Sequence, residues 1–428
     1  MFESLLNAFR APDIRRRLLY VLALLILFRF LAHVPVPGVD QQALGQYLQS
    51  NALFNVLDLL SGGGLSSFSV VALGVNPYIN ASIIMQLMTG VIPSLQALQR
   101  EGEYGRNKIN QYTRYLSVPM ALLQAYGFLA LLNSQGVLRS GFDLGNFTTL
   151  TQIVTLTAGS IALMWLGELI TEKGIGNGIS FIIFAGIVSR APSAITGFLA
   201  TPNFALVIGF AILAIVSVAV IIYIQEGQRR IPIQYASRVR GRRMYQGGQT
   251  FLPLRVNQAG VIPIIFAISI LLFPQQIASY FTNSEVDLVK GFAQAIVGFF
   301  NPQSIPYVSL YFLLTVGFTY FYTAFTFKPD ETADQLRKNG GFIPGIRPGS
   351  PTRDYLQKVV FRLSLAGALF LGTIAVSPIV LSALFPTGIV GGFALGGTAL
   401  LIVVSVVVET MKQIEAQLMM RNYEGFIR

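Results

Sequence analysis

The chain has 428 residues, of which 53% are hydrophobic and only 11% are charged, and its mean hydropathy is +0.61. An ordinary soluble protein carries about a quarter charged residues, so this composition excludes a soluble globule. The sequence has no cysteine and a single histidine, His33, which excludes disulfides, thiolate sites and multi-histidine metal cages. We therefore expect neither a metal nor a cofactor.

The apolar residues are grouped in blocks of about twenty, the length that crosses a hydrocarbon core of about 30 Å. Residues 21–28 and 399–408 are almost unbroken apolar runs, whereas the strands of a transmembrane barrel alternate apolar and polar residues. The sequence therefore predicts an all-α bundle of ten membrane-spanning helices, near residues 18–34, 75–92, 115–132, 150–170, 179–198, 204–224, 256–278, 307–327, 359–381 and 393–410.

Lysine and arginine are concentrated in alternate connections between these spans. They crowd the N-terminal segment, the loops after the second, sixth and eighth spans and the C-terminal tail, whereas the opposite loops hold only Arg139, Arg190 and Lys290. An even number of spans places both termini on one side, which the positive-inside rule makes cytoplasmic. We read the first span as uncleaved, because its apolar run is too long for a signal peptide. The net charge of +11 is thus mainly a signal of topology.

Two of the predicted cytoplasmic loops are longer than a compact bundle requires. The loop of about 225–255 carries seven arginines against one acid, Glu226, whereas the loop of about 328–358 balances its basic residues with acids. The extra positive charge of the first loop either fixes orientation and contacts anionic lipid or forms a docking surface for a cytoplasmic partner. We favour the docking surface, because long loops in compact folds are usually functional.

The connection between the first two spans contains an apolar stretch, residues 58–73, that is too short to cross a membrane and is broken by three glycines. Such a stretch enters a membrane only where protein or water surrounds it. It is either a re-entrant, cavity-filling segment or a flexible surface loop, and we favour the first.

Polar side chains are concentrated on the second and seventh spans, where polar groups usually face a bundle interior or a water-filled cavity. Ordinary hydrogen bonding between helices explains any one of them. Together they indicate that these two spans share a polar seam, formed by Asn76, Asn80, Gln86, Asn257 and Gln258.

No arrangement typical of an enzyme is present in the sequence, and we expect no catalytic residues. His33 lies at the predicted outer end of the first span, and the glycines of residues 174–180 imitate a phosphate loop without a strand before them. A small-solute secondary transporter is the rival class. It needs acidic groups near the membrane midplane, whereas Glu168 and Glu409 fall near predicted span ends. A purely structural scaffold would not explain the basic loops.

Eight motifs occur in one order along nearly the whole chain: HVPVPGVD (33–40), LSGGGLSSFSVVALGVNPYINASIIMQL (60–87), GRNKINQYTRY (105–115), MWLGELITEKGIGNGISFIIFAGIV (164–188), EGQRRIPIQYASRVRGRRMY (226–245), LPLRVNQAGVIPIIFA (252–267), FKPDETADQLRKNGGFIPGIRPG (327–349) and GGTALLIVVSVVVETM (396–411). By these motifs the chain resembles the SecY family, the channel subunit of the bacterial Sec protein translocase. The composition alone does not indicate this family.

The resemblance implies two pseudo-symmetric five-helix halves, residues 1–198 and 199–428, around a central pore. It implies a protein-conducting channel in the bacterial cytoplasmic membrane that passes unfolded secretory proteins and releases transmembrane segments sideways into lipid. The implied partners are SecE, SecG, the SecA ATPase and the ribosome, with ribosomal RNA as the one nucleic acid contacted. Signal peptides and unfolded polypeptides are the implied substrates, and energy comes from the partners.

The resemblance also assigns roles to residues of this sequence. The aliphatic ring that closes the pore comprises Val75, Ile79, Ile179, Ile183, Ile265 and Ile402. The plug segment, about residues 58–73, lies under the ring and includes Asp58, Gly62, Gly63, Gly64, Leu65, Phe68 and Leu73. Candidate lateral-gate residues are Gln86 and Asn257, and candidate partner-docking residues are Arg242, Arg243, Arg255 and Arg347. The ring pairs 75/79 and 179/183 are spaced to share one helix face.

Overall fold

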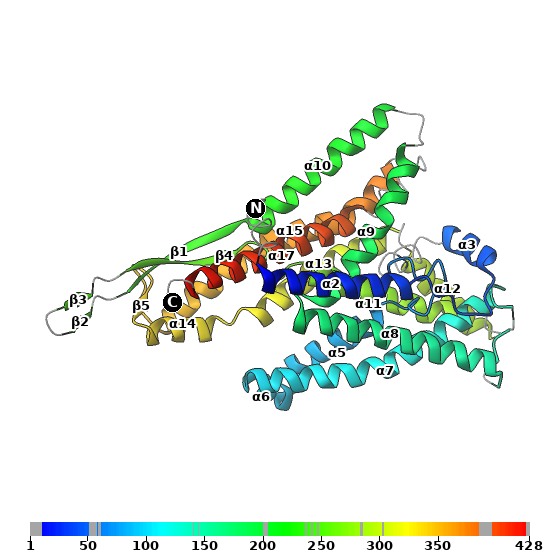
Figure 1. Ribbon diagram of the computed structural model, residues 1–428, viewed down its shortest axis with the longest axis horizontal. Helices are drawn as coiled ribbons and strands as arrows, with labels where there is room; N and C mark the ends of the chain where they lie inside the picture. The colour runs from blue at the N-terminus through cyan, green and yellow to red at the C-terminus, as the bar shows by residue number, and fades with distance from the viewer. Residues whose placement is uncertain are drawn as a thin grey trace.

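The computed structural model describes residues 11–50, 58, 61–139, 141–143, 145–199, 204–235, 238–240, 243–245, 248–282, 286–301, 304–384 and 396–424. Ten helices of this part of the chain overlap the ten predicted spans and are gathered in one bundle (Figure 1). They are α2 (Pro12–Leu31), α5 (Asn76–Val91), α7 (Glu103–Ser134), α8 (Phe147–Lys173), α9 (Gly178–Leu199), α10 (Phe204–Glu226), α11 (Ile262–Phe281), α13 (Ile305–Thr326), α15 (Ser350–Leu384) and α17 (Gly396–Glu424).

Five of the described helices are long and apolar enough to cross a membrane on their own. A sixth candidate span combines α5 with α6 (Pro93–Arg100), which are bent by 98° relative to each other. Shorter apolar stretches lie in α9, α10 and α11. Length and composition therefore agree with a multi-pass membrane protein.

The helices begin at local sequence signals. Proline occupies the first turn of α2, α5, α11 and α13, where its missing N–H is not needed and its φ suits a helix. Asn146 caps α8 by accepting a hydrogen bond from the N–H of Thr148. The proline signal also explains why α11 begins at Ile262, after its predicted start at residue 256.

Short elements mark the two ends of the bundle. At one end lie α3 (Gln41–Ser50) and α12 (Asp287–Phe299), neither of which the hydropathy pattern predicts (Figure 1). The N–H groups of Ala43 and Gln42 donate to the carboxylate of Asp40, which caps α3, and lower its pKa. At the other end α2 begins and α17 ends, so these two helices share a side.

A small sheet projects from this second end (Figure 1). Strands β1 (Gln228–Tyr235) and β4 (Gln249–Arg255) form an antiparallel hairpin, and β2 (Arg238–Arg240) pairs with β3 (Arg243–Tyr245) towards its tip. On the other side of β1, β5 (Gly341–Phe342) adds a third strand after α14 (Pro329–Lys338). The fold is mostly helical, as predicted, and these strands, which the sequence does not predict, join the two long loops into one unit.

Two apolar clusters organise the interior. The larger runs through the bundle and includes side chains from α2, α5, α7, α8, α9, α11 and α17. The smaller lies beneath the sheet. It contains Ile231 of β1, Leu254 of β4, Ile343 directly after β5, and Leu356 of α15 (Ser350–Leu384). Because this second cluster draws on both long loops, the hairpin base and the chain around β5 form a single packed body.

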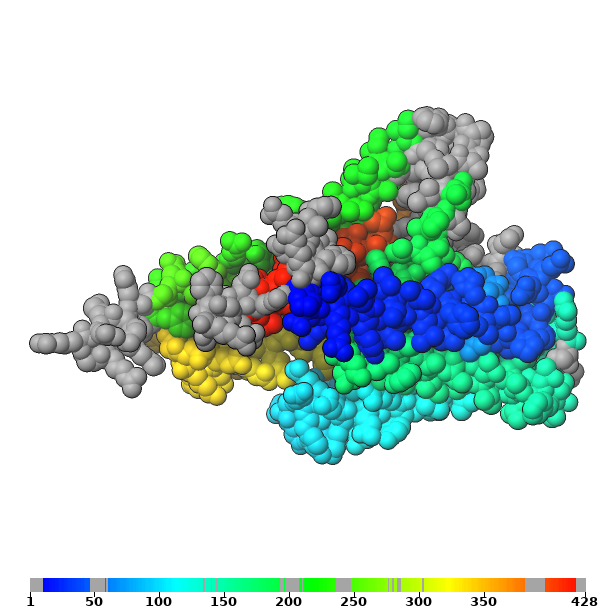
Figure 2. Space-filling model, viewed as in Figure 1, coloured from blue at the N-terminus to red at the C-terminus, as the bar shows by residue number. Residues whose placement is uncertain are grey.

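Helix α10 diverges from the rest of the bundle along much of its length (Figure 2). Its apolar side chains Ile208, Ile212 and Ile215 are exposed, the last by 69%. Near its C-terminal end, the Gln225 side-chain amide donates a hydrogen bond to the Ser405 hydroxyl of α17. The Nζ of Lys412, also on α17, lies 2.8 Å from the Oε1 of Glu226. An exposed face this apolar suits lipid or a second membrane chain rather than water.

Candidate functional site

The described residues of the plug segment, 58 and 61–73, lie largely inside the bundle rather than on its surface. Leu65, Phe68 and Leu73 are at most 7% exposed and belong to the larger apolar cluster. The end of the segment pairs with the chain that follows α2: the N–H of Val36 donates to the Phe68 carbonyl at 2.8 Å, and the N–H of Val70 donates to the Val34 carbonyl at 3.0 Å. The segment is therefore an ordered part of the core.

Glycines allow the plug segment to approach its neighbours. Gly62 and Gly63 have φ of +71° and +85°, in the left-handed region that favours glycine. A Cβ added at Gly62 would lie 2.7 Å from the Phe28 ring of α2 and 3.0 Å from the Gly186 backbone of α9. The glycine run, which the sequence presents as a break in an apolar stretch, thus permits a tight turn between two helices.

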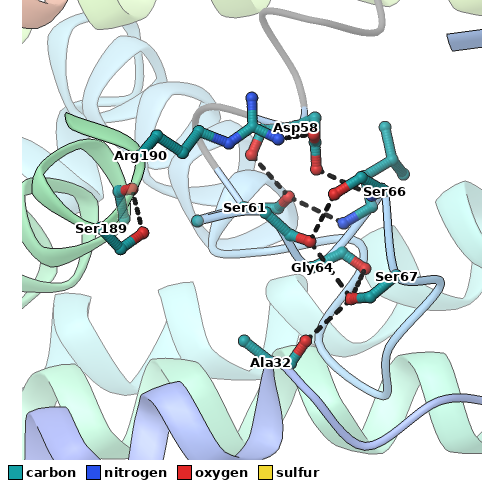
Figure 3. Close-up of polar contacts among 12 residues, drawn as sticks. Ala32, Asp58, Ser61, Gly64, Ser66, Ser67, Ser189 and Arg190 are labelled. Carbon is teal, nitrogen blue, oxygen red and sulfur yellow. Dashed lines mark hydrogen bonds and ion pairs between the residues drawn. The ribbon is translucent and has the colours of Figure 1, made fainter. Parts of the chain in front are cut away.

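Two arginines from different helices contact the plug segment. Arg190 of α9 forms an ion pair with Asp58, whose carboxylate also accepts the N–H of Ser66 at 2.8 Å (Figure 3). Arg29 of α2 donates to the carbonyl of Gly62 at 2.7 Å. The segment is therefore fixed by charged and polar contacts as well as by apolar packing.

The residues assigned to the aliphatic ring come from four helices and the turn before α5. Four of the six are at most 5% exposed, and Ile179 and Ile265 are half-buried. The four buried residues belong to the larger apolar cluster, which also holds Leu65, Phe68 and Leu73 of the plug segment, and Ile179 and Ile265 pack against it. On α8, Gly167 makes room for Ile179, because an added Cβ would lie 2.6 Å from its terminal carbon.

Two residues of the predicted polar seam, Asn76 and Asn80, lie where α5 packs against α11 and α7. A cavity of about 30 Å³ is lined there by side chains of these helices and of the plug segment, which is enough space for a water molecule. Its polar lining residues are Asn76, Asn80, Gln124 and Ser269. The sequence does not single out Gln124 and Ser269, because the residues on either side of each are apolar.

The two predicted gate residues lie in different surroundings. Gln86, on α5, borders a larger open pocket of about 490 Å³ that is lined by residues of α5, α6, α7, α13 and α14. Asn257 precedes α11 and donates to the Gly260 carbonyl at 3.1 Å, against the Gly367 backbone of α15. The side-chain oxygens of Gln86 and Asn257 are buried and accept no hydrogen bond in the described structure.

The predicted docking residues lie at the sheet end of the bundle. Arg243 belongs to β3, Arg255 ends β4 and is exposed, and Arg347 is exposed on the turn that follows β5. Arg242 lies outside the described residues. Because β1 pairs with both β4 and β5, the strand that ends at Arg255 and the strand that precedes Arg347 belong to one sheet.

Comparisons with known proteins agree on one family. The sequence model of SecY matches residues 69–411. The protein translocase subunit SecY of Mycobacterium tuberculosis is 43% identical over the full length of both chains. A SecY structure, whose description states that the plug domain stabilises the closed state and maintains a membrane seal, superposes with a TM-score of 0.63 at 20% identity, covering 93% of this chain and 91% of that one.

The fold is also similar to that of Sec61 in the canine ribosome–channel complex, with a TM-score of 0.60 at 18% identity and the same coverage. These similarities span the two halves of the bundle, and they do not support the small-solute transporter as an alternative. With the apolar helices and the buried plug segment, they lead to one assignment. The chain belongs to the SecY family of protein translocase subunits and is a protein-conducting channel in a membrane, not an enzyme.

Proposed function

We propose that this chain passes unfolded secretory polypeptides outward across the cytoplasmic membrane and releases apolar segments sideways into lipid. The observation that carries this proposal is the plug segment, a glycine-rich stretch buried inside a membrane bundle. The side chains of Arg29 of α2 and Arg190 of α9 hold it to these two helices, and it is not a continuation of either helix. A segment held in this way can move aside without unfolding the spans around it.

In this proposal the aliphatic ring closes the passage at rest. Val75, Ile79, Ile183 and Ile402 are buried in the same cluster as the plug segment, which supports a location next to it. Apolar constrictions exclude water and ions by dewetting. The ring side chains part around an extended polypeptide and close again behind it, while the plug segment adds a second seal.

The seam of α5 with α11 serves as the lateral gate. Packing between these helices joins residues 1–198 to residues 199–428, which we propose as the two halves that separate. The small polar cavity within the seam supports this role. Its polar side chains can be hydrated, which lowers the free-energy cost of separating α5 from α11. Gln86 belongs to α5 and Asn257 precedes α11, and their unused acceptor oxygens can receive N–H groups of a passing chain.

We further propose that the sheet end faces the cytoplasm, together with both termini. The positive residues of the hairpin and the exposed Arg347 then form the docking surface for the SecA ATPase and the ribosome. The structures of canine Sec61 and of the yeast Ssh1 complex, whose fold is also similar with a TM-score of 0.57, were each determined with a ribosome bound. This supports a ribosome as one partner. The exposed apolar face of α10 suits SecE or SecG as membrane partners.

Site-specific crosslinking tests the passage. A photoreactive phenylalanine is placed at Ile79 or Ile183, with Leu123, a lipid-facing residue of α7 that is 66% exposed, as the control. A secretory precursor is then arrested partway by a folded C-terminal domain. We expect crosslinks to the precursor at both ring positions and none at Leu123. Absence of crosslinks at both ring positions would place the passage elsewhere.

A locked seam tests the lateral gate. The chain has no cysteine, so Asn80→Cys with Ser269→Cys, which line the same cavity, can be joined by a short bifunctional reagent. We expect the locked channel to stop inserting a transmembrane segment, while either single variant treated in the same way inserts it normally. Normal insertion through the locked seam would refute the α5–α11 gate.

A further inference from the structure

We propose that the ion pair between Asp58 and Arg190, supported by Arg29, is the latch that sets how easily the plug segment leaves its seat. This inference rests on the proposed function of residues 58–73 as a plug. The sequence places Arg190 among the few basic residues of the side opposite the cytoplasmic loops. The structure instead directs it towards the plug segment, from a helix 132 residues further along the chain (Figure 3).

The geometry gives the Asp58 carboxylate two connections. It pairs with Arg190 across the boundary between the plug segment and α9, and it accepts the N–H of Ser66 within the segment. The Asp58 side chain is only 4% exposed, whereas that of Arg190 is 27% exposed. The guanidinium also lies over Gly63, where an added Cβ would be 3.7 Å from its Nε. The pair therefore couples α9 to the turn that shapes the segment.

Arg29 holds the neighbouring part of the same turn. Its Nη1 donates to the Gly62 carbonyl, and its positive charge acts on Arg190. With Asp58 in place, a carboxylate offsets this repulsion. When the plug segment leaves and takes Asp58 with it, both guanidinium groups lose a counter-charge or an acceptor. The latch thus opposes departure of the plug segment.

The position of this charge pair predicts a specific pattern of mutational effects. Removing one partner of a buried ion pair leaves an uncompensated charge, whereas replacing both partners with neutral groups removes the attraction and the desolvation cost together. Single neutral variants should therefore free the plug segment more than the double variant does. Simple loss of packing would instead give effects that add.

A labelling assay measures the movement. Val71 lies in the plug segment and is fully buried, so Val71→Cys in this cysteine-free chain reports departure of the segment to a water-soluble maleimide. The channel is used in its native membrane complex, reconstituted in vesicles. We expect Asp58→Asn and Arg190→Gln each to accelerate labelling about tenfold. We expect their combination to stay within about threefold of the parent.

Three controls make the result decisive. Glu168→Gln removes an ion pair of 2.6 Å with Arg114 that joins α7 to α8 away from the plug segment, and it should leave labelling unchanged. Arg190→Lys keeps the charge and should stay close to the parent, which separates loss of the latch from misfolding. Deletion of residues 58–68 should raise resting ion conductance.

The outcomes separate the two proposals. Parent-like labelling of Asp58→Asn and Arg190→Gln, with a leaking deletion variant, would overturn the latch and leave the plug in place. Additive effects in the double variant would also overturn the latch. A deletion variant without leak would overturn the plug and the latch with it.

Discussion

The plug segment and the aliphatic ring share one apolar cluster, but different interactions hold them. The ring consists of aliphatic side chains, whose contribution depends on the volume that they fill. The plug segment is fixed by an ion pair, an arginine on a carbonyl, and backbone hydrogen bonds to the chain after α2. Aliphatic side chains can close around polypeptides of different width, whereas an ion pair or a hydrogen bond is either formed or broken. In the proposed function, the ring is therefore a graded barrier and the plug segment a switched one.

The largest effect is expected where the graded barrier is removed. Ile79→Gly with Ile183→Gly empties two buried positions of the ring, so water can enter the constriction. We expect resting ion conductance in planar bilayers to rise more than about tenfold, because dewetting depends on apolar volume. Leu365→Gly with Leu369→Gly, at exposed sites of α15, is the matched control. An equal rise in both pairs would mean that glycine weakens the bundle in general.

Deleting residues 58–68 removes the switched barrier and leaves the ring. We expect a smaller rise in resting conductance than for the ring pair, with brief openings, because the ring side chains still close on one another. Single-channel recording distinguishes brief openings from a steady leak. We expect the deletion combined with Ile79→Gly and Ile183→Gly to give a higher resting conductance than either change alone. Background conductance in the deletion variant would show that the segment does not contribute to the seal.

Gly62→Ala should loosen the plug segment without removing it. A Cβ at this left-handed position costs about 1–2 kcal/mol, and it would also contact the Phe28 ring. We expect resting conductance to rise less than in the deletion variant, with normal expression. Gly209→Ala on α10, where an added Cβ meets no atom within 4 Å, serves as the control. A Gly62→Ala channel as tight as the parent would show that the close approach to α2 is dispensable.

The smallest effect on the closed state is expected at Arg347. This residue is exposed on a turn outside the bundle, so Arg347→Glu should leave resting conductance unchanged. It should lower SecA-driven translocation into vesicles about tenfold, because charge-assisted hydrogen bonds to a partner are lost. Lys338→Glu on the nearby α14 is the comparison variant. An unchanged translocation rate at matched channel levels would remove Arg347 from the docking surface.

The sequence predicts the helices better than it predicts the contacts between them. Apolar blocks of about twenty residues locate the ten helices that overlap the predicted spans, because the thickness of the lipid bilayer imposes that length. The hairpin is absent from the prediction, since arginines dominate residues 225–255. Yet Ile231 and Ile233 alternate with more exposed neighbours in β1, and this period of two was the available signal. The charge of that region concealed its strand pattern.

Pairings between distant residues leave no local pattern at all. Asp58 and Arg190 meet only because α9 passes the plug segment, and neither residue's own neighbours indicate the other. Similarly, Gln124 and Ser269 meet Asn76 and Asn80 through helix packing. The aliphatic ring was assigned by family resemblance, since buried aliphatic residues at helical spacing are equally typical of an ordinary core.

The hairpin connects two helices of the bundle, α10 and the seam helix α11. Strand β1 follows α10 after a single glycine, Gly227, and β4 runs through a short connection into α11. The N–H of Val256 donates to the Gly227 carbonyl and closes the base of the hairpin, while the small apolar cluster braces it against α15. In the proposed function, a partner that pushes on the hairpin therefore acts on α11 through the chain, and so on the α5–α11 interface, from outside the membrane.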